Sequence, residues 1–246
     1  MSHLCISTRG VCSWRDRLAN PDRQWKRKYS ALETAASWER AAGTECGLPD
    51  AIAKVLQCGG FASPVLMLAV AEHKVELPGG DAASQCDVWG IVRTDAGLLS
   101  LSVEAKAKEP FGDATLGDWL AAGSSNRSVD NRRRRWEFIR AHLPDGEFGA
   151  VPYQLLHRCA AAVIEARRFG FWQAAFVVQA FETPDDTFGE YQNFCTAVGL
   201  PASRDGMART SVVLSSLGSS EKQEVALGIG WADCTFGDDS QLAAIV

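Results

Sequence analysis

The sequence of 246 residues lacks the segments that would place a protein in a membrane or send it out of the cell. Its longest apolar run, residues 65–71, is far shorter than the roughly 20 residues that a membrane helix needs. Residues 1–6 have neither the apolar core nor the cleavage pattern of a secretory signal. A hydrophobic fraction of 46% and a mean hydropathy of −0.09 exclude intrinsic disorder and a polytopic membrane protein. We therefore expect a cytoplasmic protein with no membrane partner.

Metal-binding cysteine motifs are missing as well. The chain has eight cysteines and four histidines, but no two cysteines have C-x-x-C spacing and the histidines do not cluster with them. This pattern argues against a zinc site. A chain of this length can bury a core without disulfides, so we expect reduced thiols that are mostly small buried residues.

An excess of positive charge is also missing, since 25 Lys and Arg stand against 30 Asp and Glu, a net charge of −5. This balance excludes a basic coat that would hold nucleic acid anywhere on the surface. Positive charge is concentrated in residues 9–28 (seven basic, two acidic, net +5) and 126–140 (six basic, two acidic, net +4). Trp14, Trp25 and Trp136 lie among these charges. Such segments suit contacts with phosphates and stacked bases, although each is also typical of an ordinary solvated face.

What the sequence does contain is an alternation of helical and strand patterns. We expect helices at 30–42, 49–57 and 153–168, and strands at 64–77, 87–93, 98–106 and 174–181. Ser30 to Glu33 has the form of a capping box. This order predicts an α/β protein with a three-layer α/β/α architecture around a central mixed sheet. We expect a single domain with a core at about 30–181, a polar excursion at 107–150 and a C-terminal extension at 182–246.

The hairpin at 87–106 carries the chemical signal. If Asp95 and Ala96 form a two-residue loop, Asp87 lies opposite Glu104. If the loop lies one residue later, Asp87 lies opposite Lys106. In both registers these three side chains share one face, because side chains alternate along a strand.

Two opposed carboxylates repel each other unless something neutralises them, and a hard divalent cation does so through oxygen ligands. Lys106 is placed to orient or deprotonate a metal-bound water, or to stabilise charge in a phosphoryl transition state. The plain alternative is a surface hairpin whose Glu104 and Lys106 are solvated charges.

The spacing of Asp87 and the run Val103-Glu104-Ala105-Lys106 resembles the signature of the PD-(D/E)XK nuclease superfamily, which has a restriction-endonuclease-like fold. Cys86 stands where that signature often has a proline. The resemblance implies a nuclease that hydrolyses phosphodiester bonds, with DNA as the expected substrate. It implies Mg²⁺, which Mn²⁺ can replace, bound by Asp87 and Glu104 while Lys106 assists the attacking water.

The resemblance also implies supporting residues outside the hairpin. An upstream helix would contribute a third metal ligand, for which Glu39 is favoured over Glu33. The helix after the hairpin would place Gln154 in the catalytic site. Further expected substrate contacts come from Gln85, Arg158, Arg133 and Arg134.

Three functions remain open from the sequence. The first is the nuclease, in host defence or DNA processing, with a homodimer or a partner protein supplying specificity. The second is a non-catalytic module for nucleic-acid binding or assembly that keeps the nuclease fold. The third is an α/β enzyme acting on a small acidic metabolite, which the absence of a P-loop and of a nucleophile elbow makes weaker.

Overall fold

A computed structural model describes residues 10–215 and 222–238 of the chain. The helices are η1 (Val11–Arg17), α1 (Pro21–Gln24), α2 (Ser30–Ala41), α3 (Asp50–Cys58), α4 (Leu116–Ala121), α5 (Asn126–Arg140), α6 (Tyr153–Arg168) and α7 (Asp185–Ala197). The strands are β1 (Val65–Val75), β2 (Ser84–Thr94), β3 (Gly97–Lys106), β4 (Gln173–Phe181), β5 (Gly206–Ser215) and β6 (Lys222–Cys234). The predicted elements therefore form, most of them within two or three residues of their expected ends.

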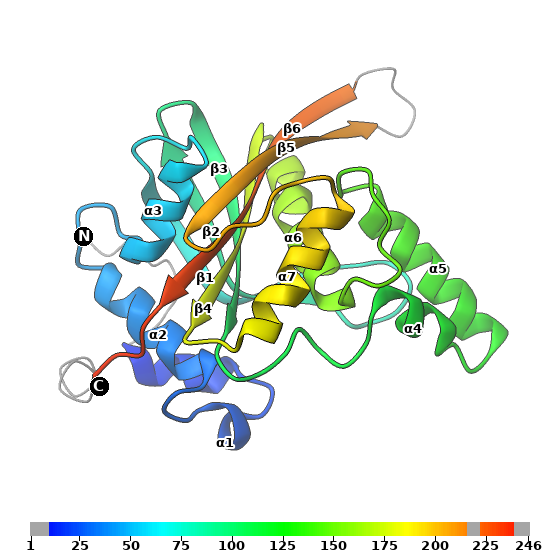
Figure 1. The fold of residues 1–246 in the computed structure, drawn as a ribbon, viewed down its shortest axis with the longest axis horizontal. Coiled ribbons are helices and arrows are strands. Elements are labelled where there is room, and N and C mark those ends of the chain that lie inside the picture. The colour runs from blue at the N-terminus through cyan, green and yellow to red at the C-terminus, as the bar shows by residue number, and fades with distance from the viewer. Residues whose placement is uncertain (1–9, 216–221, 239–246) are drawn as a thin grey trace.

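All six strands form one mixed sheet in the order β1-β2-β3-β4-β6-β5. Neighbours in the β1-β2-β3 meander are antiparallel, β4 lies parallel to both β3 and β6, and β5 is antiparallel to β6. Helices α2 and α3 cover one face of the sheet, and α6 and α7 cover the other, as Figure 1 shows. The fold is thus the three-layer α/β/α arrangement that the sequence predicts.

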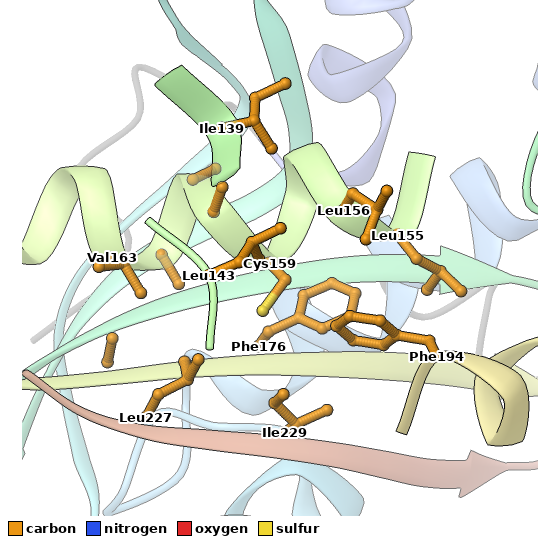
Figure 2. Packing of buried hydrophobic residues seen from close by; sticks show 14 of the residues in the cluster. Ile139, Leu143, Leu155, Leu156, Cys159, Val163, Phe176, Phe194, Leu227 and Ile229 are labelled. Carbon is orange, nitrogen blue, oxygen red and sulfur yellow. The ribbon is translucent and has the colours of Figure 1, made fainter. Parts of the chain in front are cut away.

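Two apolar cores lie between these layers. The larger joins β4 and β6 to α6, α7 and the end of α5, and Figure 2 shows Phe176 and Ile229 of the strands meeting Cys159 and Phe194 of the helices. The other packs α2 and α3 against the opposite face. Strand β4 is buried at every position because it is central and has helices on both sides.

Two regions differ from the sequence prediction. The polar excursion contains helices α4 and α5, and α5 buries only Arg135 and Ile139, so it had no apolar stripe to reveal it. The region expected as an extension, 182–246, contributes β5 and β6 to the central sheet. Strand β6 of this region pairs directly with β4 in a parallel arrangement.

Smaller corrections concern a helix cap and the cysteines. Tyr29 is the N-cap of α2, so Ser30 does not cap it, and Glu33 accepts from the Lys28 backbone N–H at 3.0 Å. Seven free cysteines lie in the described residues, three of them buried: Cys86, Cys159 and Cys195. Burial is therefore less general than expected, and Cys5 lies outside the described residues. Within the described ranges, no helix is long and apolar enough to cross a membrane.

Candidate functional site

The β2–β3 hairpin turns through a two-residue loop. Thr94 pairs with Gly97 and Val88 with Val103, so the next step of the same register places Asp87 opposite Glu104. The alternative register, with Lys106 opposite Asp87, is wrong. Pairing ends at this level because Asp87 Oδ2 accepts the Ala105 backbone N–H at 2.6 Å.

Strand alternation is interrupted at Asp87. Cys86 and Trp89 both pack in the core on the α6 side, whereas Val88 packs in the core on the α2 side. The antiparallel register of β1 with β2 places Glu72 beside Asp87, and Glu72 has a φ of 54°, in the left-handed region. Both acids are thereby excluded from the two apolar cores at one level of the sheet.

These residues line one pocket of about 290 Å³, named here the acidic pocket. Its polar lining comes from β1, β2, β3, the loop after β3 and α6: Glu72, Gln85, Asp87, Glu104, Lys106, Glu109, Gln154 and Arg158, together with Gln24 and Ser30 near α2. Four carboxylates thus meet two cations, which leaves an excess of negative charge.

Glu104 is the best-partnered of the four acids. Its Oε1 accepts from Gln154 Nε2 at 2.7 Å and lies 2.9 Å from Lys106 Nζ, while its Oε2 accepts from Arg158 Nε at 2.6 Å. Burial alone would raise the pKa of Glu104, but the Lys106 and Arg158 cations hold it below the ordinary value. Glu104 is therefore ionised and fixed in position.

Asp87 and Glu72 have the opposite electrostatics. Burial and then the neighbouring Glu104 and Glu72 carboxylates raise the pKa of Asp87 well above its ordinary value. Burial also raises the pKa of Glu72 to about 7, against the effect of the hydrogen bond that it accepts from Gln85 Nε2 at 2.6 Å. Without a cation in the pocket, both carboxyl groups therefore retain their protons to a higher pH than an ordinary carboxyl group does.

Lys106 is held by the same network. Its side chain is almost buried, and Nζ donates to Gln154 Oε1 at 3.1 Å in addition to its ion pair with Glu104. The ammonium also lies 5.2 Å from the centre of the Phe111 ring. An ammonium group has three N–H donors, so one remains for a group that enters the pocket.

The structure brings together most of the side chains that the sequence singled out. Six predicted site residues line the acidic pocket: Gln85, Asp87, Glu104, Lys106, Gln154 and Arg158. Arg158, predicted as a substrate contact, is bound to Glu104.

Three predicted site residues lie elsewhere. Glu39 does not line the pocket, because its Oε1 accepts from the indole N–H of Trp14 at 2.7 Å. Arg133 and Arg134 are exposed on α5 and also lie outside it. Trp14 itself is buried against α2 and offers no stacking surface.

Two acids of the pocket were missed from the sequence. Glu72 directly follows the apolar run of β1. The change from apolar residues to an acid at this point was the only feature of the sequence that could have marked it as a site residue. The loop between β1 and β2 is too long to fix their register from sequence, so nothing paired Glu72 with Asp87. Glu109 lies three residues after Lys106, and the Ser30 hydroxyl hydrogen-bonds to it.

The chemistry of the donors decides whether a metal suits the acidic pocket. The described residues contain no ready-made group of three or more His, Cys, Asp or Glu side chains that could hold a metal ion. Mg²⁺, however, is usually held by one or two carboxylates together with substrate phosphates and waters. A carboxylate oxygen that accepts one hydrogen bond retains further acceptor capacity, and a nearby cation would favour the ionised forms of Asp87 and Glu72, whose pKa values are raised. The side chains therefore fit Mg²⁺ bound by Asp87 and Glu104, with Glu72 beside them.

Comparison with known proteins identifies a family whose description gives no activity. A protein-family model described as a domain of unknown function, DUF6946, matches residues 7–235. No curated protein matches the chain, and no solved structure matches it.

Proposed function

Because the chain belongs to the DUF6946 family, whose description gives no activity, we propose from the site that it is a metal-dependent nuclease that hydrolyses phosphodiester bonds, with DNA as its expected substrate. One observation carries the proposal. The hairpin register sets Asp87 against Glu104 and places Lys106 on the same face, inside one pocket with surplus negative charge. That arrangement is the one whose chemistry the sequence signature implies.

In this proposal Asp87 and Glu104 hold Mg²⁺. Bound there, Mg²⁺ would supply a water ligand of lowered pKa and positive charge toward the phosphate. Glu104 is held ionised by Lys106 and Arg158, so its position changes little when a cation enters. Asp87 is fixed by the Ala105 backbone N–H, and because its pKa is raised it would release its proton when a cation binds.

Lys106 and Gln154 act on the substrate side. The remaining N–H donor of Lys106 contacts the attacking water or a phosphate oxygen, where positive charge stabilises the transition state. Gln154 is a positioning residue, because its amide oxygen accepts from Lys106 while its amide nitrogen donates to Glu104. It therefore fixes the separation between the ligand acid and the catalytic ammonium.

Glu72 is proposed as the acceptor of the proton that the attacking water loses. Its pKa of about 7 leaves a large fraction of the carboxylate ionised at neutral pH, which is the balance a general base requires. Gln85 donates to Glu72 and orients it in the pocket.

One observation favours a second candidate function. Glu104 receives bonds from three side chains, an arrangement that also serves as a structural ion-pair network. A non-catalytic nucleic-acid-binding or assembly module would keep such a network without cleavage.

The test incubates wild type, Lys106→Ala and Lys108→Ala with linear, supercoiled and single-stranded DNA and with RNA, in Mg²⁺, Mn²⁺ or EDTA. Lys108 is exposed two residues beyond Lys106 and serves as the matched control. We expect cleavage that needs the metal, persists in Lys108→Ala and falls at least about 100-fold in Lys106→Ala. Equal cleavage by all three proteins would remove Lys106 from the mechanism. Binding without cleavage on every substrate would favour the second function.

A further inference from the structure

A second pocket, of about 370 Å³, is lined by the opposite charge. Arg127, Arg132 and Arg135 of α5 contribute three guanidinium groups, and Asp81 is the one acid among the lining residues. The loop at 79–82, Trp119 and polar residues of α5 complete the lining. We name this the basic pocket.

Arg135 is a buried cation without a counter-ion. Its exposed fraction is 8%, and its guanidinium donates to the backbone carbonyls of Pro78 and Gly80, at 3.0 and 3.3 Å. No carboxylate of the described residues forms an ion pair with it. At least two of its five N–H donors are thus used, and a buried cation without an acid partner can pair with an anion that enters the pocket.

The other two arginines are equally without acid partners in the described part of the chain. Arg132 donates to the Trp119 carbonyl and stacks over that indole, 4.8 Å from the ring centre, so its guanidinium is held in place. Arg127 is exposed at the mouth of the pocket and has no ion pair there. Three guanidinium groups therefore converge on a space in which Asp81 is the one lining acid, and no ion pair joins Asp81 to any of them in the described residues.

The loop that faces these arginines is packed tightly onto α5. Gly79 has a φ of +79°, and a Cβ at this position would lie 2.1 Å from the Asn131 carbonyl oxygen. Only glycine permits this approach, which brings the Pro78 and Gly80 carbonyls to Arg135. The pocket is thus built by the fold rather than by flexible surface side chains.

The basic and acidic pockets are lined by neighbouring residues of the same segments. The run 79–87 supplies Ala82 to the basic pocket and Gln85 to the acidic one, and three residues span at most about 11 Å. On α6, Tyr153 stacks on Trp119 of the basic pocket at 4.1 Å, and the next residue, Gln154, lines the acidic pocket. A single extended nucleic-acid strand can therefore contact the acidic pocket and the basic pocket at once.

We infer that the basic pocket binds a backbone phosphate of the same nucleic-acid strand whose scissile phosphate enters the acidic pocket. That the scissile phosphate enters the acidic pocket rests on the proposed nuclease function. A phosphodiester supplies the oxygen acceptors that arginine N–H groups recognise in pairs.

The test measures binding, so it does not depend on cleavage. Fluorescence anisotropy in EDTA follows a labelled 20-nucleotide single-stranded DNA without terminal phosphates, using wild type, Arg127→Ala, Arg127→Ala/Arg132→Ala and Arg133→Ala/Arg134→Ala. The last variant removes two exposed charges of the same helix that do not line the pocket. We expect about 10-fold weaker binding for the pocket double variant and less than about twofold weakening for the control. Arg127→Ala, which changes an exposed side chain, is expected to weaken binding about threefold and to fold as wild type.

Three results would overturn the inference. The first is equal weakening by the two double variants, which would indicate nonspecific charge. The second is complete competition by inorganic phosphate at the concentration of the DNA, which would identify a free phosphate as the ligand. The third is an affinity that rises about 10-fold with a 5′- or 3′-terminal phosphate, which would indicate an end-binding pocket. Selective weakening without any cleavage in Mg²⁺ would support the phosphate site and contradict the nuclease proposal, so the two failures are distinguishable.

Discussion

The acidic and basic pockets share the segment 79–87, yet they balance charge differently. In the acidic pocket Glu104 is paired with Lys106 and Arg158, whereas Asp87 and Glu72 have no such cation, and their raised pKa values show that a negative charge there is unfavourable without one. In the basic pocket no cation is paired with an acid of the described residues, and neutral carbonyls hold Arg135. Each pocket therefore keeps a surplus charge whose sign is opposite to that of the ligand we propose for it.

The largest expected effect comes from Asp87→Asn. The amide keeps an oxygen for the Ala105 N–H but removes the ligand charge, so cleavage should fall about 1000-fold or more, equivalent to about 4 kcal/mol. The same substitution removes repulsion from Glu104 and Glu72, so the metal-free protein should melt at a higher temperature than wild type. Nuclease assays and thermal unfolding in EDTA measure the two effects. A lower melting temperature together with lost cleavage would indicate a structural role for Asp87.

A smaller effect is expected on stability, where replacement of Arg158, which is paired with Glu104, differs from replacement of Arg135, which has no ion pair. Arg158→Met leaves the buried Glu104 with Lys106 as its only cation, and we expect a loss of about 3 kcal/mol in the free energy of unfolding. Arg135→Met breaks no ion pair, and the loss of its hydrogen bonds to two carbonyls should cost about 1 kcal/mol. Urea unfolding of both variants gives the comparison. Equal losses would mean that the acidic pocket gains nothing from its internal pairing.

The pH dependence of stability is expected to be smaller still. Glu72 has a pKa raised to about 7 in the folded protein against an ordinary value of 4.5, because burial disfavours its ionised form. Its contribution to stability is therefore fully present below pH 4.5 and lost as the pH rises through 7. We expect the metal-free protein to lose on the order of 2 kcal/mol across this window, and Glu72→Gln to flatten the change.

Asp87 shifts stability in the same direction and Glu104 in the opposite one, since their pKa values are raised and lowered respectively. The comparison of wild type with Glu72→Gln gives the contribution of Glu72 together with its effect on the pKa of Asp87. Identical pH profiles for the two proteins would show that Glu72 titrates at its ordinary value, and would remove it as the proposed base.

The pockets also differ in how far the sequence could predict them. Asp87, Glu104 and Lys106 were predictable because a two-residue turn fixes the hairpin register, and Gln154 because α6 has a strong helical pattern. Glu72 was not predictable, because the connection from β1 to β2 leaves their register open. In α5 the four consecutive arginines look alike in sequence, and only the packing of the helix decides that Arg132 and Arg135 line a pocket while Arg133 and Arg134 face solvent.

The fold shows the same distinction between local and distant information. Helices α2, α3 and α6 follow from their own composition, whereas the place of β6 between β4 and β5 depends on pairing with β4, as between Gln173 and Ala226, with α7 and β5 lying between them in the sequence. Helix α5 has few apolar residues of its own, so its sequence does not reveal it. Its position depends on its packing against α6.

The most direct test of the central claim measures Mn²⁺ binding to the protein without nucleic acid, by calorimetric titration of wild type and Asp87→Asn. The account predicts that wild type binds one ion in the acidic pocket and that the variant binds it at least about 10-fold more weakly, because the substitution removes a ligand charge. Equal binding by the two proteins, or no binding by wild type, would contradict it.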